Sequence, residues 1–256
     1  MKKKIFALAF AASLALSLFA CGDSSAENES KSPSSTPSDA VESTPEPTPE
    51  PKAEEAYEIT YSSVKTYTNS IGTTYAQVIV EIENTGTVDL YLSSGSYDLE
   101  DENGKLIASS SMVSTYPEVI SPGEKAYMYE ENMLDDAVKG GLTVLPRPDV
   151  KKAKVENIRY NVTDVEIASD KYGWLKAIGR VENTTEKDED GMIYVVIILK
   201  EESGTPIGQI FTIIMEDLAA GDKIGFEATA MSLPDDVTAD VVASYDVFAY
   251  PMQMQF

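Results

Sequence analysis

Residues 78–85 read Val-Ile-Val-Glu-Ile-Glu-Asn-Thr, and residues 177–184 read Ala-Ile-Gly-Arg-Val-Glu-Asn-Thr. In both stretches the side chains at every second position are apolar or small, and both then end in the same Glu-Asn-Thr sequence. Alternation with a period of two residues is typical of a β-strand, and the polar residues that follow indicate a turn. Because every matched position is separated by the same interval, the chain carries two copies of one β-rich unit. The matched residues are Val78, Val80, Ile82, Glu83, Asn84 and Thr85 with Ala177, Gly179, Val181, Glu182, Asn183 and Thr184.

The match continues outside these strands. Residues 122–125, Pro-Gly-Glu-Lys, correspond to residues 220–223, Ala-Gly-Asp-Lys, and in both copies an aromatic strand follows. Asn103 and Gly104 correspond in the same way to Ser203 and Gly204, at points where an apolar strand turns back. Such pairs are hairpin signals. The interval between the copies leaves about 100 residues for each domain.

Helical periodicity is nearly absent, and residues 193–199 form a continuous apolar run typical of a buried central strand. Short strands with regular turn signals predict an all-β chain with two tandem immunoglobulin-like antiparallel β-sandwiches. We expect repeat 1 at residues 57–162 and repeat 2 at residues 163–256. The predicted closing strands are Val155 to Val162 and Val241 to Phe248, with a short, stiff junction from Tyr160 to Asp164.

The second copy resembles the FxLYD domain of bacterial surface lipoproteins. The resemblance rests on Arg180 to Thr184, an apolar strand, an acidic turn that ends at Gly204, and Leu218 to Asp222. It implies an immunoglobulin-like sandwich outside the cell, usually with no known ligand. Ile198, Leu199 and Lys200 stand where the family has Leu, Tyr and Asp, whereas the first copy keeps Tyr97 and Asp98 in a comparable place.

The N-terminus has the anatomy of an export signal. Three lysines after Met1 precede an apolar stretch from Ile5 to Ala20, and this stretch is shorter than the roughly 20 residues of a membrane-spanning helix. Residues 18–21, Leu-Phe-Ala-Cys, resemble the lipobox of bacterial lipoproteins. The resemblance implies a signal peptide at 1–20, diacylation of Cys21, and attachment to the extracytoplasmic face of a bacterial membrane. The alternative is cleavage and release as an ordinary secreted protein.

Residues 21–56 are predicted to be a disordered stalk that begins at the lipidated cysteine. The segment is rich in Ser, Thr, Pro and Glu, and after Cys21 its one sizeable apolar residue is Val41. Such a composition cannot bury enough surface to offset the entropy of ordering the chain. Its prolines favour an extended polyproline II conformation, and its carboxylates repel one another.

The chain has no histidine, and Cys21 is its only cysteine. Mechanisms that need an imidazole or a free thiolate are therefore not expected, and we predict neither catalytic residues nor a cofactor. A hydrolase that uses only carboxylates stays open as an alternative, but it needs two acids in a cleft with pKa values pushed apart.

Two acidic loops are candidates for calcium binding, because hard cations take six to eight oxygen ligands. The candidate ligands are Asp98, Glu100 and Asp101 before Gly104, and Glu186, Asp188 and Asp190 before Gly191. Neither loop has the spacing of an EF-hand. Solvated hairpin tips are the other interpretation.

Cleavage of the signal removes three lysines, which leaves 17 basic against 43 acidic residues and a net formal charge of −26. This charge excludes nucleic acid as a partner and favours a module held away from anionic lipid. Trp174 is expected to be a core or rim aromatic rather than a stacking platform for a ligand. The tail from Tyr250 to Phe256 is expected to extend the last strand or to lie over the end of the sandwich.

The sequence predicts a non-enzymatic lipoprotein that acts outside the cell membrane as a binding or spacer module. Its membrane contact is the diacylglycerol anchor, and its partner is expected to be a protein of the cell envelope. The alternative is a small-ligand or calcium-binding accessory of an envelope transport or sensing system.

Overall fold

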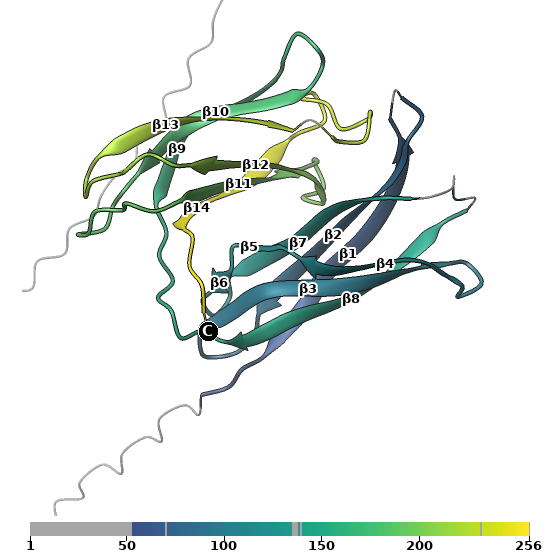
Figure 1. Ribbon diagram of the computed structural model, residues 1–256, viewed down its shortest axis with the longest axis horizontal. Helices are drawn as coiled ribbons and strands as arrows, with labels where there is room; N and C mark the ends of the chain where they lie inside the picture. Colours follow the sequence, from purple (N-terminus) through teal and green to yellow (C-terminus); the bar gives the residue numbers. More distant parts are fainter. Residues whose placement is uncertain (1–52, 70, 135–137, 139, 231, 256) are drawn as a thin grey trace, which may run out of the picture. The chain divides into compact units, whose positions relative to one another are not determined.

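The computed structural model describes residues 53–69, 71–134, 138, 140–230 and 232–255, all within one compact unit. The predicted signal peptide, the anchor Cys21 and the stalk as far as residue 52 lie outside these residues. The described residues form fourteen strands and no helix. The prediction of an all-β, sandwich-like fold is confirmed (Figure 1).

Repeat 1 has two antiparallel sheets. In the first sheet the strand order is β1-β2-β7-β5, and in the second β3 pairs with β4 and also with β6 and β8. The strands are β1 (Tyr57–Thr68), β2 (Thr74–Asn84), β3 (Leu90–Asp101), β4 (Leu106–Val113), β5 (Thr115–Tyr116), β6 (Val119–Ile120), β7 (Lys125–Met133) and β8 (Leu142–Lys152).

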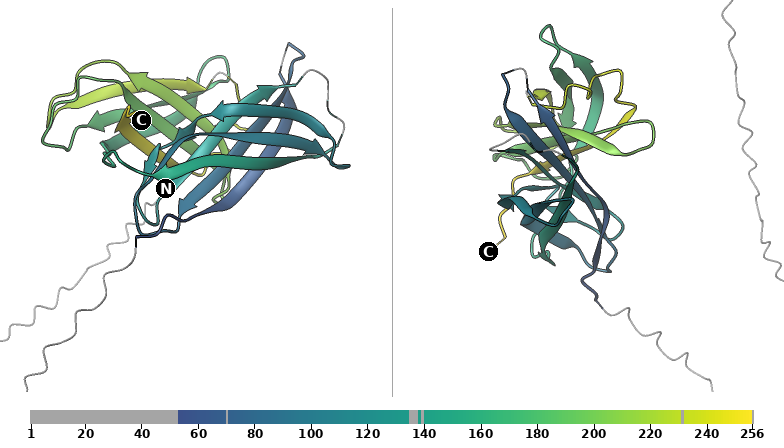
Figure 2. Two further views of the ribbon diagram at one scale, coloured as in Figure 1. Left: turned by 60° about the horizontal axis from the view of Figure 1, so that its bottom comes forward. Right: turned by 90° about the vertical axis from the view of Figure 1, so that its right-hand side faces the viewer.

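Repeat 2 has the same arrangement without the short strands β5 and β6. Its sheets have the orders β9-β10-β13 and β12-β11-β14. The strands are β9 (Asn161–Ser169), β10 (Leu175–Glu182), β11 (Ile193–Lys200), β12 (Pro206–Ile214), β13 (Lys223–Ala230) and β14 (Ser244–Pro251). In the left view of Figure 2 the blue-to-teal strands and the green-to-yellow strands form two groups.

The repeated asparagine anchors the crossover from one sheet to the other. In repeat 1 the side chain of Asn84 is fully buried, and its amide nitrogen donates hydrogen bonds to the carbonyls of Val88 and Ile120, at 2.8 and 2.9 Å. Its Oδ1 accepts a hydrogen bond from the backbone N–H of Gly86 at 3.0 Å. A buried polar group must be paired, so this side chain replaces the ladder partners that the crossover lacks.

Asn183 makes the same set of bonds in repeat 2. Its amide nitrogen donates to the carbonyls of Lys187 and Leu218, at 2.8 and 3.0 Å, and its Oδ1 accepts from the N–H of Thr185 at 3.0 Å. The side chain is again fully buried. The shared Glu-Asn-Thr motif therefore has one structural role in both copies.

The hairpin signals are also borne out. Gly104 and Gly204 both have positive φ, at 74° and 83°, a conformation that favours glycine. In one turn the N–H of Gly104 donates to the carbonyl of Asp101, and in the other the N–H of Gly204 donates to that of Glu201. The structure thus places the two turns at equivalent points.

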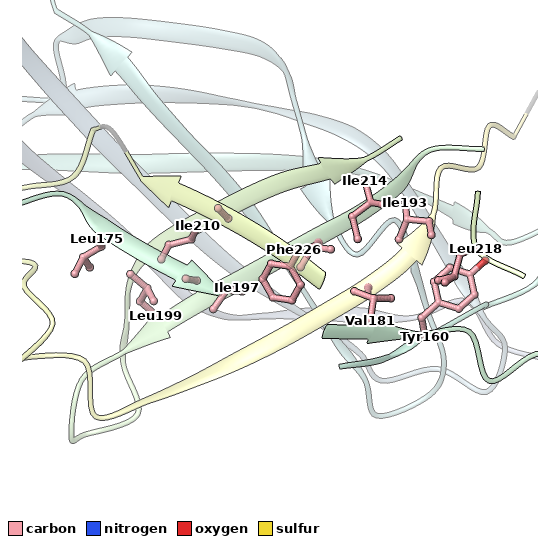
Figure 3. Close-up of a cluster of buried hydrophobic side chains, with 14 of the residues drawn as sticks. Tyr160, Leu175, Val181, Ile193, Ile197, Leu199, Ile210, Ile214, Leu218 and Phe226 are labelled. Carbon is pink, nitrogen blue, oxygen red and sulfur yellow. The ribbon is translucent and has the colours of Figure 1, made fainter. Parts of the chain in front are cut away.

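Each sandwich has its own hydrophobic core. In repeat 2 the apolar side chains of β10, β11, β12 and β13 converge between the two sheets, where Phe226 and Val181 face Ile197 and Ile193 (Figure 3). In repeat 1 the equivalent core contains Val78, Val80 and Ile82. The alternating residues of the quoted stretch therefore form the inner face of the strand, as the pattern predicts.

Three predicted boundaries are corrected by the structure. The closing strand of repeat 1 is β8, residues 142–152, because it pairs with β3, whereas residues 155–160 form no strand. The closing strand of repeat 2 is β14, Ser244–Pro251, a few residues beyond the predicted range. The connection between the repeats runs from residue 153 to 160, before the predicted junction, and β9 already begins at Asn161.

The last residues assigned to the stalk belong to the folded unit. The carbonyl of Ala56 accepts hydrogen bonds from the N–H groups of Thr85 and Gly86, and the carbonyl of Glu54 accepts one from the N–H of Thr87. Gly86 allows this close approach, since a Cβ there would lie 2.4 Å from the Glu54 oxygen.

The two repeats pack against each other through different sheets. Repeat 1 uses the outer face of the β1-β2-β7-β5 sheet, and repeat 2 uses the outer face of the β12-β11-β14 sheet. We call the shared apolar residues the inter-repeat cluster: Tyr127, Val196, Ile198 and Tyr250, with Tyr116, Tyr194, Phe211 and Phe248 packed against them. Because of this contact, β2 and β11 are buried on both faces.

A paired set of charges lies beside the inter-repeat cluster. Glu81 is 6% exposed, and its Oε1 accepts a hydrogen bond from the Lys125 ammonium at 2.6 Å. The Tyr127 hydroxyl lies 2.9 Å from Oε2 of Glu81 and 2.6 Å from Oδ2 of Asp246, which belongs to repeat 2. Burial raises the pKa of Glu81, but its hydrogen bonds, led by that from Lys125, outweigh burial and hold the pKa below its usual value.

Candidate functional site

A cleft of about 320 Å³ opens where equivalent hairpins of the two repeats meet. The hairpin between β1 and β2 contributes Tyr67 and Asn69, and the hairpin between β9 and β10 contributes Tyr172 and Trp174. The segment that follows β13, within residues 230–238, forms the rest of the lining. We call this site the aromatic cleft. Its volume is at the lower end of the range of about 300 to 1,000 Å³ that small-ligand sites occupy.

The aromatic rings at this cleft are accessible to solvent. Trp174 is 43% exposed and Tyr172 is 68% exposed, although aromatic side chains of this size gain most from burial. The two rings lie 5.6 Å apart, and the Lys171 ammonium lies 4.8 Å from the centre of the Tyr172 ring. Trp174 therefore lies at the rim, which is one of the two places expected for it, and its face is open to contact.

The turn beneath these rings is fixed by the Asp170 side chain. Its Oδ1 accepts hydrogen bonds from the N–H groups of Tyr172 and Trp174, at 2.8 and 2.9 Å. Asn69 holds the equivalent turn of repeat 1 by accepting from the N–H groups of Ile71 and Thr73. Short polar side chains that bond to their own turn in this way restrict its conformations. The aromatic rings are thus presented from defined turns.

Two contacts join the repeats beside the aromatic cleft. The Lys65 ammonium lies 2.5 Å from Oδ2 of Asp236, and the Tyr67 hydroxyl lies 3.0 Å from the Ser232 hydroxyl. Burial, above all other causes, raises the pKa of Tyr67 to about 12, so this hydroxyl is neutral at physiological pH. An exposed ion pair contributes little stability, so these two contacts add little to the association of the repeats.

The lining of the aromatic cleft has an acidic character. Asp235 is among the lining residues, and the described lining contains no Lys or Arg. Two lysines lie close by: Lys65, which is paired with Asp236, and Lys171, which lies against the Tyr172 ring. Rings combined with carboxylates suit ligands that are neutral and hydroxyl-rich or cationic, because both components repel anions.

A second cleft, of about 580 Å³, lies at the connection between the repeats and includes Arg159, Lys125 and Asp246 in its lining. Arg159 is engaged internally: it donates to the carbonyls of Ile158 and Val119, and its guanidinium lies 5.4 Å from the centre of the Tyr250 ring. Burial lowers the pKa of Arg159. These contacts indicate a structural role for the arginine at the inter-repeat contact.

One carboxyl of the described residues has a raised pKa. Burial raises the pKa of Glu118 to about 7, although a hydrogen bond with the backbone of Gln253 acts in the opposite direction. Its Oε2 is buried without a hydrogen-bond partner among the described residues. Hydrolysis by two carboxylates requires two acids in one cleft with pKa values pushed apart, and Glu118 is not among the residues that line the two clefts described above.

The C-terminal tail both extends the last strand and lies over the end of a sandwich, the two placements that the sequence allows. Tyr250 and Pro251 extend the last strand, and the Met252 N–H then donates to the carbonyl of Met192 at 2.8 Å. Beyond it, the side chain of Gln255 accepts from the N–H of Lys154 and donates to the carbonyl of Lys152. The tail therefore lies against the end of repeat 1.

In the first acidic loop, the structure does not bring the candidate calcium ligands together. Asp98 is paired with Arg147 at 2.9 Å and with the Ser109 hydroxyl, and these two partners lower its pKa. Asp101 accepts hydrogen bonds from the N–H groups of its own turn. Glu100 lies between them in β3.

In the second loop, Oδ1 of Asp188 accepts a hydrogen bond from the N–H of Ala220, whereas Glu186 and Asp190 are exposed. No group of three or more acidic, His or Cys side chains within the described residues is arranged to hold a metal ion. The first loop is the tip of the hairpin between β3 and β4, whereas the second lies in the crossover from β10 to β11.

The aromatic cleft was not predicted from the sequence. The sequence alone marks Trp174 as a single aromatic residue and does not single out Tyr172. The signal was the repeat itself, because the turn that contains Gly173 is equivalent to the turn that contains Gly72, and both glycines have positive φ. The sequence does not reveal that both hairpins end at the same cleft.

The chain was compared with known proteins. No family model matches it, and no curated protein matches it. A solved structure described as the "D341A D367A calcium binding mutant of Bacteroides uniformis beta-glucuronidase 2" is similar over 72% of this chain, at 14% identity and a TM-score of 0.21. The matched part spans 25% of that chain. The described residues contain no helix that is long and apolar enough to cross a membrane.

Proposed function

We propose that this chain is a non-enzymatic lipoprotein of the bacterial cell envelope, tethered through Cys21, that binds a partner at the aromatic cleft. The resemblance of residues 18–21 to a lipobox supports the anchor, and the resemblance of repeat 2 to the FxLYD domain supports a position outside the cell. On this proposal the proline-rich segment before residue 53 carries the folded unit away from the membrane.

The observation that carries the binding function is the pair of exposed rings at a cleft built by both repeats. A spacer needs only a soluble surface, whereas Trp174 and Tyr172 keep apolar area in solvent at a fixed turn. Tyr and Trp are favoured at recognition surfaces, because they offer a large contact area at a low cost in conformational entropy. A binding module therefore explains this feature better than a spacer.

An envelope protein is the partner that we propose. The contact would involve the rings of the aromatic cleft and a neutral or basic segment of the partner, since Asp235 and the overall negative charge disfavour an acidic one.

Crosslinking on intact cells tests this proposal. A photoreactive phenylalanine derivative replaces Tyr172 in one strain and Tyr245, which is exposed but outside the aromatic cleft, in the control strain. We expect one dominant adduct with an envelope protein from position 172, and its loss when Trp174→Ala is added. Equal adducts from both positions, or none from position 172, would contradict binding at the cleft.

The anchor is tested separately by Cys21→Ser. Diacylation holds a chain on the bilayer through the burial of its acyl CH₂ groups, at about 0.8 kcal/mol for each group. We therefore expect the wild-type protein in the membrane fraction and the Cys21→Ser variant outside it. Retention of the variant in the membrane fraction would contradict a lipid anchor at Cys21.

A further inference from the structure

Three methionines each stand one residue beyond the last paired residues at one end of the β12-β11-β14 sheet. Ile193 of β11 is opposite Ile214 of β12 and opposite Pro251 of β14. Met192 precedes Ile193, and Met215 and Met252 follow Ile214 and Pro251, so continuing each ladder by one residue brings Met192 opposite both. The Met252 N–H donates to the Met192 carbonyl at 2.8 Å, so the ladder with β14 does continue to this point.

The three side chains share one face of the sheet. Ile193 and Ile214 point into the core of repeat 2, and successive residues of a strand point to opposite faces. Continued past the strand ends, this alternation puts Met192, Met215 and Met252 on the outer face, at the margin of the contact with repeat 1. Opposite residues on one face have Cβ atoms about 4.5 to 5.5 Å apart. A methionine side chain is long and flexible enough to bring three such sulfur atoms to one point.

All three side chains are accessible. Met192 is 41% exposed, Met252 is 42% exposed and Met215 is 72% exposed. Packing does not explain three adjacent, partly exposed thioethers. The loops next to them are acidic, with Asp190 two residues before Met192 and with Glu216 and Asp217 directly after Met215. A cation is therefore attracted to this end of the sheet.

We propose that Met192, Met215 and Met252 form a binding site for a soft monovalent cation, copper(I). Thioether sulfur is a soft ligand that selects Cu(I) over hard ions such as calcium or magnesium. A thioether carries no proton, so the metal displaces none on binding. This property separates the proposed site from sites made of thiolate, imidazole or carboxylate, whose ligands must first lose a proton.

The composition of the chain removes the other common ligands of soft cations from the test. With no histidine and one cysteine, the full chain with Cys21→Ser has neither imidazole nor thiol. Any tight binding of a soft cation by this chain must then involve methionine. Silver(I) is a suitable first probe, because it has the same preference for sulfur and needs no reductant.

The experiment is a titration of the full-length Cys21→Ser chain with Ag(I) by calorimetry in chloride-free buffer, repeated with Cu(I) under anaerobic conditions against a chromophoric chelator. We expect one ion for each chain and an affinity that changes less than about threefold between pH 5.5 and 8, because no ligand titrates. X-ray absorption of the Cu(I) complex should show sulfur neighbours at the metal.

Matched substitutions assign the ligands. Met192→Leu removes the central sulfur at nearly constant volume, and we expect it to weaken binding more than tenfold. The control is Met112→Leu with Met133→Leu, because both methionines are exposed and lie in repeat 1. This double variant should bind as the parent chain does. Folding of each variant is checked by its thermal unfolding.

Other outcomes would overturn the proposal. Equal loss of affinity in the control double variant would show unspecific binding to exposed methionines. If the parent chain bound neither ion more tightly than the Met192→Leu variant does, the three-thioether site would be contradicted. An affinity that falls steeply below pH 6 would also contradict it.

Discussion

The two repeats have the same inner architecture, but they differ in which sheet has an apolar, buried outer face. This difference explains how they associate. In repeat 1 the outer residues of β3 include Ser96, Asp98 and Glu100, and they face solvent or surface partners. At the equivalent places of β11, repeat 2 has Val196, Ile198 and Lys200, of which Val196 and Ile198 are buried in the inter-repeat cluster. The same strand is thus a surface strand in one copy and an interface strand in the other.

In the other sheet of each repeat, the outer face is buried in repeat 1 and exposed in repeat 2. Ile79 of β2 is 2% exposed, because the outer face of its sheet lies against repeat 2, whereas the equivalent Ile178 of β10 is 40% exposed. Glu81 is buried and paired with Lys125, whereas the side chain of Arg180, at the same place in repeat 2, is largely exposed. Inner residues and turns therefore set the sandwich, and outer residues set the assembly.

The largest effect is expected from the feature that the repeats share. Asn84→Ala and Asn183→Ala each leave two buried carbonyls and one N–H without the side chain that pairs them. Since an unsatisfied buried group costs about 1 to 3 kcal/mol, each variant should lose on the order of 3 kcal/mol of unfolding free energy. Chemical denaturation measures this loss. Asn161→Ala, which removes one exposed hydrogen bond, is the control and should change stability little.

Unequal effects of the two asparagine substitutions would contradict the equivalence of the repeats. If Asn84→Ala lost about 3 kcal/mol and Asn183→Ala less than about 0.5, the motif would have a structural role in only one copy.

The next effect separates the two outer faces. Val196→Ser removes a fully buried side chain from the inter-repeat cluster and should cost about 2 kcal/mol. The reciprocal Ser96→Val, at the equivalent place of repeat 1, should change the unfolding free energy by less than about 0.5 kcal/mol, because it adds a side chain at a surface position. Equal costs for the two substitutions would show that these faces do not differ in burial.

A pH dependence is expected at the contact between the repeats. The folded state holds the pKa of Glu118 near 7, above its usual value, so the folded protein binds this proton more tightly than the unfolded chain does. The resulting contribution to stability decreases as the pH rises from about 4.5 to about 7, and it is constant above and below this range. Glu118→Gln should remove this part of the pH dependence, which thermal unfolding at pH 5 and pH 8 measures. An unchanged difference between the two pH values would contradict the buried position of Glu118.

The sequence predicts the fold well because the repeat is encoded locally. The Asn84 motif, the Gly104 and Gly204 turns and the alternation in β2 each depend on residues close in sequence. The closing strands are less well predicted, because Val155 to Val162 has a strand-like composition, whereas β8 with Pro146 and Pro148 does not. Pairing with β3 decides between them, and pairing is a long-range property.

The binding site is less predictable for the same reason. Residues 193–199 were correctly interpreted as a buried strand, but the sequence does not reveal that repeat 1 covers their outer side. The aromatic cleft depends on that contact, because one hairpin comes from each repeat. The row of three methionines likewise depends on the register of β11 with β12 and β14.

The central claim is that packing through the inter-repeat cluster holds the two sandwiches together. Its most direct test is a spin-label distance measurement between Ser111→Cys in repeat 1 and Glu227→Cys in repeat 2, both exposed, in a chain with Cys21→Ser. The structure predicts one narrow distance distribution, which broadens when Val196→Ser and Ile198→Ser are added. A distribution that is already broad without these two substitutions would show two independently moving domains and would contradict the account.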